Sequence, residues 1–212
     1  MGRVSQPLLV LATHNQGKLS ELRALLDGAV PGLDVNTQVV DAGAVGAPDV
    51  RETGVTFQEN ALLKAREVAE HTGLIAVADD SGLAVDVLGG APGFLSARWA
   101  GKHGDDQANL DLLLAQLGDI EDPEHRRAGF VCAAAVAVPG GEDRVHMGEL
   151  SGTLLREPRG AGGFGYDPIL LPEGETRSCA ELTAAEKNAI SHRGKAFRAL
   201  IPDLVRLLAE RV

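Results

Sequence analysis

Residues 73–93 read GLIAVADDSGLAVDVLGGAPG, and they hold the strongest structural signal in the chain. Residues 74–78 form a short, uncharged apolar run, typical of a strand buried on both faces, although a buried helical segment has the same pattern. Asp79 and Asp80 follow this run. Ligands bind at the carboxyl ends of strands in open α/β sheets, so the two carboxylates form a candidate site. Asp-Asp-Ser-Gly is also ordinary turn composition, and the sequence alone leaves both interpretations open.

The composition indicates an acidic protein with an aliphatic core. The chain has 212 residues, a length that suits one large domain or two closely joined lobes. Its net charge of −10 argues against a protein that coats nucleic acid, but allows a small anion held in a local basic pocket. Cys132 and Cys179 form no CxxC pair, which favours reduced thiols over a disulfide scaffold or a zinc site. With no targeting segment or membrane span expected, we predict a cytoplasmic protein.

The segment after the first apolar run has the pattern of a phosphate-binding loop. Residues 8–12 predict a buried strand, residues 13–18 read THNQGK, and leucines at helical spacing follow. The N-terminus of a helix favours an anion, and Lys18 adds a full charge. The GxxxxGK[ST] pattern of a Walker A loop is absent. An Asn15 helix cap beside an exposed Lys18 explains the same residues, and this alternative stays open.

A second helix is predicted between a capping box and a glycine. Thr56 and Glu59 form the box, and Gly73 is expected to end the helix. Lys64 lies within the apolar stripe of this helix, with Asn60 beside it. The lysine either extends along the surface to reach water or points into a polar cleft, and the pattern does not decide between them.

The remaining elements are expected to alternate between strands and helices. They are a strand at 33–40, another at 83–88, extended chain at 94–99, a helix that begins at Asp105 or Asp106, a hairpin of strands at 128–138 and 145–155, a helix that begins at Thr183, and a last helix after Lys195.

Two segments in the second half of the chain indicate a ligand. Residues 160–168 read GAGGFGYDP, and glycines interleaved with two aromatics suggest backbone that passes close to a flat ligand. Residues 186–198 carry four basic side chains and one acidic side chain in a chain that is acidic overall. This reversal of charge indicates an anionic ligand, although a solvated basic face has the same composition.

Taken together, these segments resemble the inosine triphosphate pyrophosphatase family, whose members clear non-standard purine nucleoside triphosphates. The resemblance extends in order over nearly the whole chain, and one visible departure is His14, where a smaller residue is expected. The matching motifs are THNQGK at 13–18, ETG and the following FQENA within 52–61, ADDSG at 78–82, GGFGYDP at 162–168 and SHRG at 191–194.

The resemblance implies a fold, a reaction and a set of roles. The fold is an elongated mixed α/β sheet flanked by helices, with two lobes around a nucleotide-binding cleft, in a single domain over residues 1–212 that usually forms a homodimer. The reaction is Mg²⁺-dependent hydrolysis of ITP, dITP or XTP to the monophosphate and pyrophosphate. The resemblance implies Asp80 as general base and metal ligand, and Glu52 as a second metal ligand. It places on the triphosphate Thr13, Asn15, Lys18, Lys64 and Lys187, with His14, Gln16 and Gly17 in the same loop. It places around the nucleoside Ser81, Phe164, Gly165, Tyr166 and Asp167, with Phe164 stacked on the base, and at the purine edge His192 and Arg193.

The residue chemistry is consistent with that reaction, and two other functions remain. Carboxylates without a His/Cys cluster favour Mg²⁺ over zinc, and phosphate chemistry needs mainly positioning and neutralised charge. One alternative is a related pyrophosphatase for modified pyrimidine or methylated nucleotides, which would lack the SHR segment. The other is a non-catalytic nucleotide-binding regulator. Paired carboxylates argue against the regulator, because they weaken triphosphate binding unless a metal bridges them.

Overall fold

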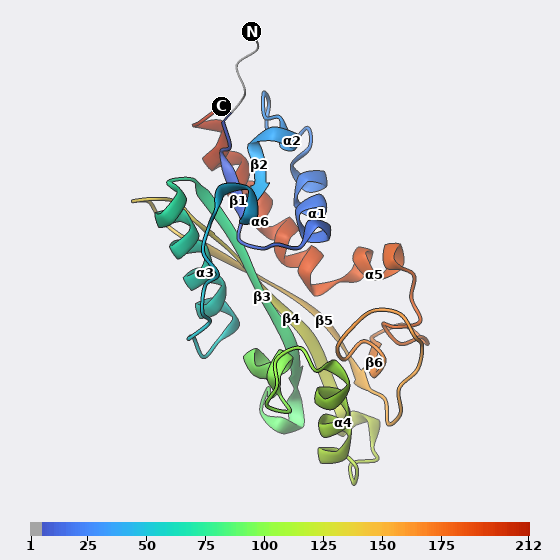
Figure 1. Cartoon of the computed structure of the whole chain (residues 1–212). Coiled ribbons are helices and arrows are strands. Elements are labelled where there is room, and N and C mark those ends of the chain that lie inside the picture. Colours follow the sequence, from blue (N-terminus) through green and yellow to red (C-terminus); the bar gives the residue numbers. More distant parts are fainter. Residues whose placement is uncertain (1–5) are drawn as a thin grey trace. The chain divides into compact units, whose positions relative to one another are not determined.

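The computed structural model describes residues 6–212 (Figure 1). Its strands are β1 (Leu9–Leu11), β2 (Val39–Asp41), β3 (Ile75–Val85), β4 (Arg127–Ala137), β5 (Arg144–Leu154) and β6 (Leu170–Pro172). Its helices are α1 (Gln16–Leu26), α2 (Val35–Gln38), α3 (Phe57–Thr72), α4 (Asp106–Gln116), α5 (Ala184–Ile190) and α6 (His192–Ala209).

The strands form one mixed sheet in the order β2-β1-β3-β4-β5-β6. β1 is parallel to both of its neighbours, with Leu9 opposite Val39 of β2 and Ile75 of β3. β5 and β6 are antiparallel. Parallel neighbours need a crossover connection, which α1 and α2 supply between β1 and β2. α3 connects β2 to β3, the two strands that flank β1. The expected α/β fold with a mixed sheet and flanking helices is confirmed.

β3 corrects the prediction of a strand, a turn and a second strand. The segment is one continuous strand, so Asp79 and Asp80 lie in its middle rather than at its carboxyl end. Turn composition is a local preference, whereas strand pairing satisfies the backbone of every residue along the ladder. Ladder pairing therefore prevails over the local turn preference of Asp-Asp-Ser-Gly.

Three other predicted boundaries differ from the structure. The segment 33–40 is mostly the short helix α2, because Asp34 caps it by accepting the N–H of Asn36, and only its end joins β2. Residues 94–99 are not extended, since Gly93–Arg98 is a 3₁₀ helix. The last helix begins at His192 rather than after Lys195.

The helix ends predicted from capping residues are confirmed. Oγ1 of Thr56 accepts the N–H of Glu59 at the start of α3, and Gly73 ends this helix with φ +71°. Thr183 and Glu186 form a complete capping box at α5, and Asp105 caps α4. The strands expected at 128–138 and 145–155 are also present, as the sheet neighbours β4 and β5.

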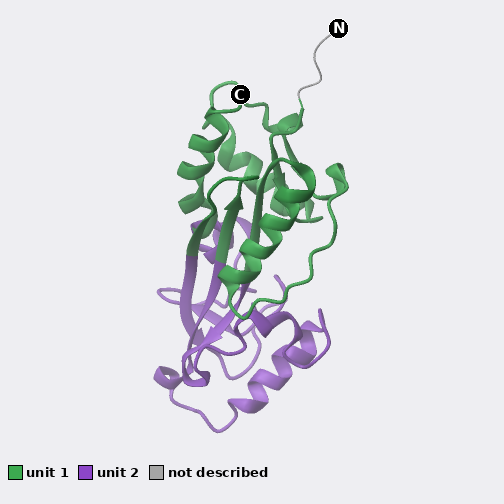
Figure 2. Ribbon diagram, turned by 90° about the vertical axis from the view of Figure 1, so that its left-hand side faces the viewer, with its two compact units in different colours: residues 1–80, 133–147, 196–212 green, residues 81–132, 148–195 purple. Residues whose placement is uncertain are grey.

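The chain divides into two compact units (Figure 2). Unit 1 comprises residues 1–80, 133–147 and 196–212, and unit 2 comprises residues 81–132 and 148–195. The chain changes unit four times, inside β3, β4, β5 and α6. The assignment of residues 1–212 to a single domain stays a prediction, and residues 1–5 lie outside the described part of the chain.

Each unit has its own apolar core. Unit 1 buries leucines of β1, α1 and α6, and a further cluster of this unit is rich in alanine, which allows helix and strand to approach closely. This cluster contains Val10, Ala61, Ala65, Val68, Ala69, Ala76, Ala78, Ala133, Ala135 and Ala137. The core of unit 2 is built from larger side chains, namely Leu83, Val85, Leu110, Leu113, Leu117, Ala128, Phe130, Leu150, Leu154, Tyr166, Ile169, Leu170 and Cys179. Cys132 and Cys179 are buried, and neither is part of a disulfide.

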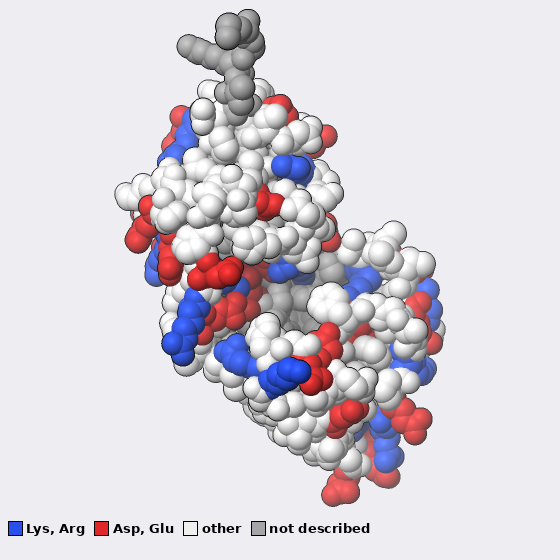
Figure 3. Space-filling model, in the orientation of Figure 1, with Lys and Arg blue, Asp and Glu red and all other residues white. Residues whose placement is uncertain are grey.

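Charged side chains of both signs are interspersed on the face shown in Figure 3, without a continuous basic field. Among residues 6–212, no helix combines the length and the apolar character that a membrane crossing requires.

Candidate active site

The loop between β1 and α1 is fixed by a helix cap. Oδ1 of Asn15 accepts the N–H of Lys18 at 3.2 Å, and the N–H of Asn15 donates to Oγ1 of Thr13 at 3.2 Å. The alternative interpretation of Asn15 as a cap is therefore confirmed. It is compatible with anion binding, because the first turn of an α-helix has N–H groups without intrahelical partners at the positive end of the helix dipole.

Lys18 forms an ion pair with Asp79, the first of the two adjacent aspartates. Its Nζ lies 3.1 and 2.9 Å from the two carboxylate oxygens. The side chain of Asp79 is 3% exposed, whereas that of Lys18 is 31% exposed. The carboxylate is thus enclosed, while the lysine keeps access to solvent and to a ligand. Asp79 holds the lysine of α1 against β3.

Asp80 has a different environment, as expected for neighbours on a strand. It is partly exposed, and its Oδ2 accepts from Nδ2 of Asn60 on α3 at 3.1 Å. Oδ1 of the same Asn60 accepts the N–H of Gly54 at 2.8 Å. One buried amide therefore connects Asp80 with the segment that follows Glu52.

Glu52 and Lys64 form a second ion pair, with Nζ of Lys64 2.5 Å from Oε1 of Glu52. The two side chains are 26% and 16% exposed, respectively. Lys64 therefore pairs with a carboxylate. Of the two alternatives left open by its position in the apolar stripe, this excludes a side chain that only extends along the surface to reach water. Asn60 and Lys64 are four residues apart and share a face of α3.

The donor set of unit 1 fits a hard divalent cation. Glu52 and Asp80 supply carboxylate oxygens, the ligands that Mg²⁺ prefers. Among residues 6–212 no group of three or more His, Cys, Asp or Glu side chains could hold a metal ion. Mg²⁺ commonly takes one or two protein carboxylates and completes its shell with water and substrate phosphates, so two carboxylates are sufficient.

The two remaining side chains of the loop, His14 and Gln16, contact acidic residues. Nε2 of His14 lies 3.2 Å from Oδ1 of Asp49. Nε2 of Gln16 donates to Asp41. Hydrogen bonds from the N–H of Ala44 and from Gln16 hold the pKa of Asp41 below its ordinary value. Gln16 thus ties the loop to the end of β2, His14 ties it to the segment after β2, and both side chains remain exposed.

Unit 2 presents one exposed aromatic ring beside a lysine. Phe164 is 76% exposed, and Nζ of Lys187 lies 4.9 Å from the centroid of its ring. The same Nζ lies 2.5 Å from Oδ2 of Asp167, which also accepts the N–H of Phe164 at 2.8 Å. Asp167 is 2% exposed, so a buried carboxylate holds both the backbone of Phe164 and the lysine.

The glycine-rich segment is shaped by the protein's own chain. A Cβ at Gly163, whose φ is +72°, would lie 2.1 Å from Oδ2 of Asp167, so the absence of a side chain makes room for this carboxylate. Tyr166 is buried, and its hydroxyl donates to the carbonyl oxygen of Ser96 at 2.9 Å. Burial raises the pKa of Tyr166 well above its ordinary value. In this segment the ring of Phe164 is therefore exposed, whereas Tyr166 is buried.

The basic residues expected at the purine edge open α6. Oγ of Ser191 accepts the N–H of Gly194 at 3.0 Å, which caps this turn. The ring of His192 stacks on Phe130 with a centroid distance of 5.2 Å and an interplanar angle of 28°. His192 and Arg193 are both partly buried.

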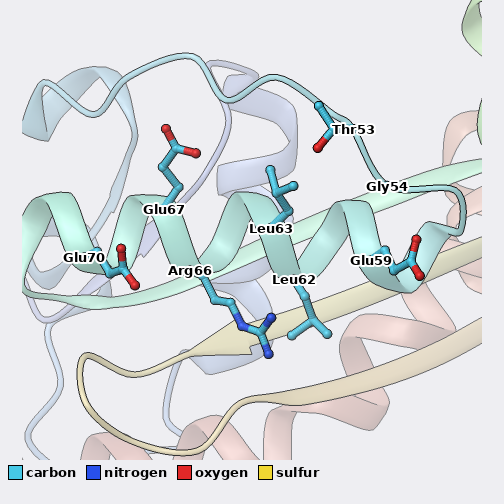
Figure 4. A pocket seen from close by; sticks show the side chains of 8 residues that line it. All are labelled: Thr53, Gly54, Glu59, Leu62, Leu63, Arg66, Glu67 and Glu70. Atoms are coloured by element: carbon cyan, nitrogen blue, oxygen red, sulfur yellow. The ribbon is translucent and has the colours of Figure 1, made fainter.

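A hollow of about 680 Å³ lies along the outer side of α3 (Figure 4). Three of the side chains around it are glutamates and one is an arginine, so its charge is unsuited to a triphosphate. We do not assign the substrate to it. It is lined by Thr53, Gly54, Glu59, Leu62, Leu63, Arg66, Glu67 and Glu70.

Comparisons with known proteins identify the family. A sequence model of the Ham1 family matches residues 9–203. The chain belongs to the Ham1 family. A Streptomyces coelicolor protein named dITP/XTP pyrophosphatase is 68% identical over 200 residues, which cover 94% of this chain and 98% of the relative.

Solved structures of Ham1 relatives share the fold. The structure of a HAM1 protein from Coxiella burnetii has a TM-score of 0.84 at 40% identity, and covers 95% of this chain and 100% of the relative. A nucleoside-triphosphatase, or dITP/XTP pyrophosphatase, from Mycobacterium abscessus has a TM-score of 0.77 at 52% identity, and covers 92% and 98%. The family resemblance recognised in the sequence is confirmed.

The structure groups the predicted site residues of this Ham1 chain into two sets. Unit 1 holds the loop 13–18, Glu52, Lys64 and Asp80, and unit 2 holds Ser81, residues 164–167, Lys187, His192 and Arg193.

Two of the side chains that contact predicted site residues of the Ham1 chain had no role assigned to them from the sequence. Asp79 holds Lys18, and Asn60 holds Asp80. A signal for Asn60 was present, because it is a polar residue on the apolar stripe of α3, one turn before Lys64. The pairing of Lys18 with Asp79 joins segments 61 positions apart, and no local pattern indicates it.

Proposed function

We propose that this chain is a Mg²⁺-dependent pyrophosphatase that hydrolyses non-standard purine nucleoside triphosphates, namely ITP, dITP and XTP. The observation that carries the proposal is the set of carboxylates and lysines in unit 1, each already held by a protein partner: Lys18 by Asp79, Lys64 by Glu52, and Asp80 by Asn60. The named activity of the Streptomyces coelicolor relative supports it.

The residues of unit 1 are suited to phosphate chemistry. Lys18 and Lys64 exchange their carboxylate partners for phosphate oxygens when the triphosphate binds, while Thr13, Asn15 and the first turn of α1 contribute donors. A Mg²⁺ ion held by Glu52 and Asp80 would neutralise charge on the phosphates.

Asp80 is the group that takes up a proton in the proposed reaction. It accepts the proton of the attacking water, and the water oxygen forms a bond to the α-phosphorus. The bond from this phosphorus to the α–β bridging oxygen breaks. Pyrophosphate is the leaving group, and the nucleoside monophosphate is the other product. Lys18 and Lys64 hold the leaving group, and Lys187 is kept as a further candidate cation for the triphosphate.

The residues of unit 2 are suited to a purine base. Phe164 presents an exposed ring on which a base can stack, an interaction worth about 1–3 kcal/mol. His192 and Arg193 are proposed to read the base edge. The guanidinium has donors only, which suits the O6 acceptor of a 6-keto purine and leaves the amino group of adenine unpaired. Rejection of GTP then depends on its 2-amino group.

The test is a comparison of kcat/KM for ITP, XTP, GTP and ATP with Mg²⁺, with pyrophosphate and orthophosphate measured separately. We expect pyrophosphate in one step, good turnover of ITP and XTP, poor turnover of GTP, and ATP rejected by roughly 10⁴-fold. Asp80→Asn should lower kcat by at least about 10²-fold, whereas Asp111→Asn, an exposed change on α4, should not.

Several outcomes would contradict the proposal. Sequential release of orthophosphate through a diphosphate would exclude cleavage between the α and β phosphates. Activity on ATP within about tenfold of ITP would exclude reading of the base edge, and unchanged ratios in His192→Ala and Arg193→Ala would move the specificity to other residues. Turnover of pyrimidine or methylated nucleotides, or binding without turnover, would favour the two alternative functions.

The proposal also places the protein in the cytoplasm, where the nucleotide pool is used, and gives it a homodimeric state. Light scattering of the purified protein measures this state directly. A mass of 22.1 kDa in solution would contradict the dimer, because it is the mass of one chain.

A further inference from the structure

Asn60 is a fully buried polar residue on α3, directly before the core alanine Ala61. A buried carboxamide is costly unless its donor and its acceptor are both used. Both ends of Asn60 are used: Oδ1 accepts the N–H of Gly54 at 2.8 Å, and Nδ2 donates to Oδ2 of Asp80 at 3.1 Å. The residue therefore connects a loop to the middle of β3.

The chemistry of these two contacts fixes the orientation of the amide. A rotation by 180° about the terminal torsion would turn Nδ2 toward the N–H of Gly54, a donor facing a donor. It would also turn Oδ1 toward the carboxylate of Asp80, an acceptor facing an acceptor. Asn60 therefore has one favourable orientation, and Asp80 receives its hydrogen bond in a fixed direction.

Gly54 gives an independent sign that the loop is seated closely on Asn60. A Cβ at this position would lie 2.7 Å from Oδ1 of Asn60 and 2.7 Å from Cβ of Glu59. One turn along α3, Lys64 holds Glu52. Two side chains from one face of the helix therefore fasten the segment 52–54.

We propose that Asn60 is a positioning residue, which sets the carboxylate of Asp80 in register with the segment that carries Glu52. The inference rests on the proposed function, in which Glu52 and Asp80 are the two working carboxylates. A displacement of a working group by about 1 Å costs on the order of 10²-fold in rate. An aspartate at position 60 keeps the shape of the side chain but turns an acceptor toward Asp80.

The kinetic test compares Asn60→Asp and Asn60→Ala with the same changes at Asn109. Asn109 is a matched control, because it is also buried on a helix and its Oδ1 accepts the N–H of Ala100 at 2.7 Å, a contact that involves no predicted site residue. We expect kcat of Asn60→Asp to fall by about 10²-fold with KM within about threefold of the wild type. Asn109→Asp should keep kcat within about threefold.

A second readout needs neither turnover nor metal. Hydrogen exchange of the Gly54 amide, followed by NMR, should be slow in the free wild-type protein and fast in Asn60→Ala, because its acceptor is lost. The side-chain NH₂ of Asn60 should shift and exchange faster in Asp80→Asn. This second measurement leaves position 60 unchanged, so it remains informative where an Asn60 variant fails to fold.

The outcomes separate the two proposals. Three outcomes would each overturn the role of Asn60 and leave the proposed function intact. They are a Gly54 amide that exchanges fast in the wild type, an Asn60 NH₂ signal that does not shift in Asp80→Asn, and wild-type kcat in Asn60→Asp when Asp80→Asn is inactive. Wild-type activity of Asp80→Asn would instead remove Asp80 from the proposed reaction. The exchange data would then still report the hydrogen bonds of Asn60.

Discussion

Replacement of Lys18 by methionine is expected to destabilise the protein more than replacement of Asp79 by asparagine. Both carboxylate oxygens of Asp79 accept from Nζ of Lys18. The side chain of Asp79 is 3% exposed and that of Lys18 is 31% exposed. Loss of the lysine therefore leaves a carboxylate where water has little access, whereas loss of the carboxylate leaves a lysine that can turn to solvent.

The magnitude follows from this asymmetry. Removal of one partner from a fully buried ion pair costs about 3–5 kcal/mol. Because Lys18 is about one-third exposed, solvent screening lowers the expected cost of Lys18→Met to about 1–3 kcal/mol. Asp79→Asn keeps the side-chain volume and should cost about 0.5–1.5 kcal/mol. The double variant contains neither charge and should lose less than the sum of the two single changes.

The measurement is urea unfolding of the four proteins at pH 7, with Lys102→Met as the matched control. Lys102 is 82% exposed and 4.0 Å from Asp105, so its replacement should change the free energy of unfolding by less than about 0.5 kcal/mol. Two results would show that Asp79 does not depend on Lys18: an unchanged free energy of unfolding in Lys18→Met, or a double variant whose loss of free energy equals the sum of the losses in the two single variants.

Three further predictions concern single side chains. Phe164→Ala should raise KM for ITP about 5- to 150-fold through the loss of base stacking. The unfolding curve should not change, because the ring is exposed, and an unchanged KM would exclude base stacking. Arg126→Met should lower the free energy of unfolding by about 3–5 kcal/mol in urea, because the buried guanidinium donates to four backbone carbonyl oxygens; a loss below about 1 kcal/mol would contradict this. The pKa of Glu186 is lowered to about 2, from 4.5, by hydrogen bonds from Arg177 and then Thr183, so its stabilisation is complete above pH 4.5 and is lost as the pH falls through about 2. Urea midpoints at pH 5, 4 and 3 should therefore fall less steeply in Glu186→Gln than in the wild type, and parallel profiles would refute this assignment.

The fold features predicted correctly from the sequence are those that a few neighbouring residues decide. The start of α3 at Thr56 and its end at Gly73 depend on contacts within one helical turn. The segment around Asp80 was predicted wrongly, because a continuous β3 depends on strands far away in the chain. α6 begins at His192 because the hydroxyl of Ser191 caps a turn that the isolated sequence presents as a break.

For the site, the sequence indicated which charged residues are present but not which groups contact one another. The sequence identified Lys18 and Lys64 as cations but did not indicate that they pair with Asp79 and Glu52. Ion pairs of this kind are set by the packing of α1 and α3 against other segments. The glycines near Phe164 were interpreted as clearance for a ligand. At Gly163 the clearance is used by Asp167, a contact that composition does not reveal.

The division of the chain into interleaved units has a consequence for how such a protein can change during evolution. Each unit is assembled from separate stretches of the gene, and every passage from one to the other falls inside a strand or a helix. Recombination cannot exchange one unit for another without cutting an element in the middle. Within this architecture, a new base preference is therefore expected to arise by successive point substitutions, not by the gain of a ready-made module.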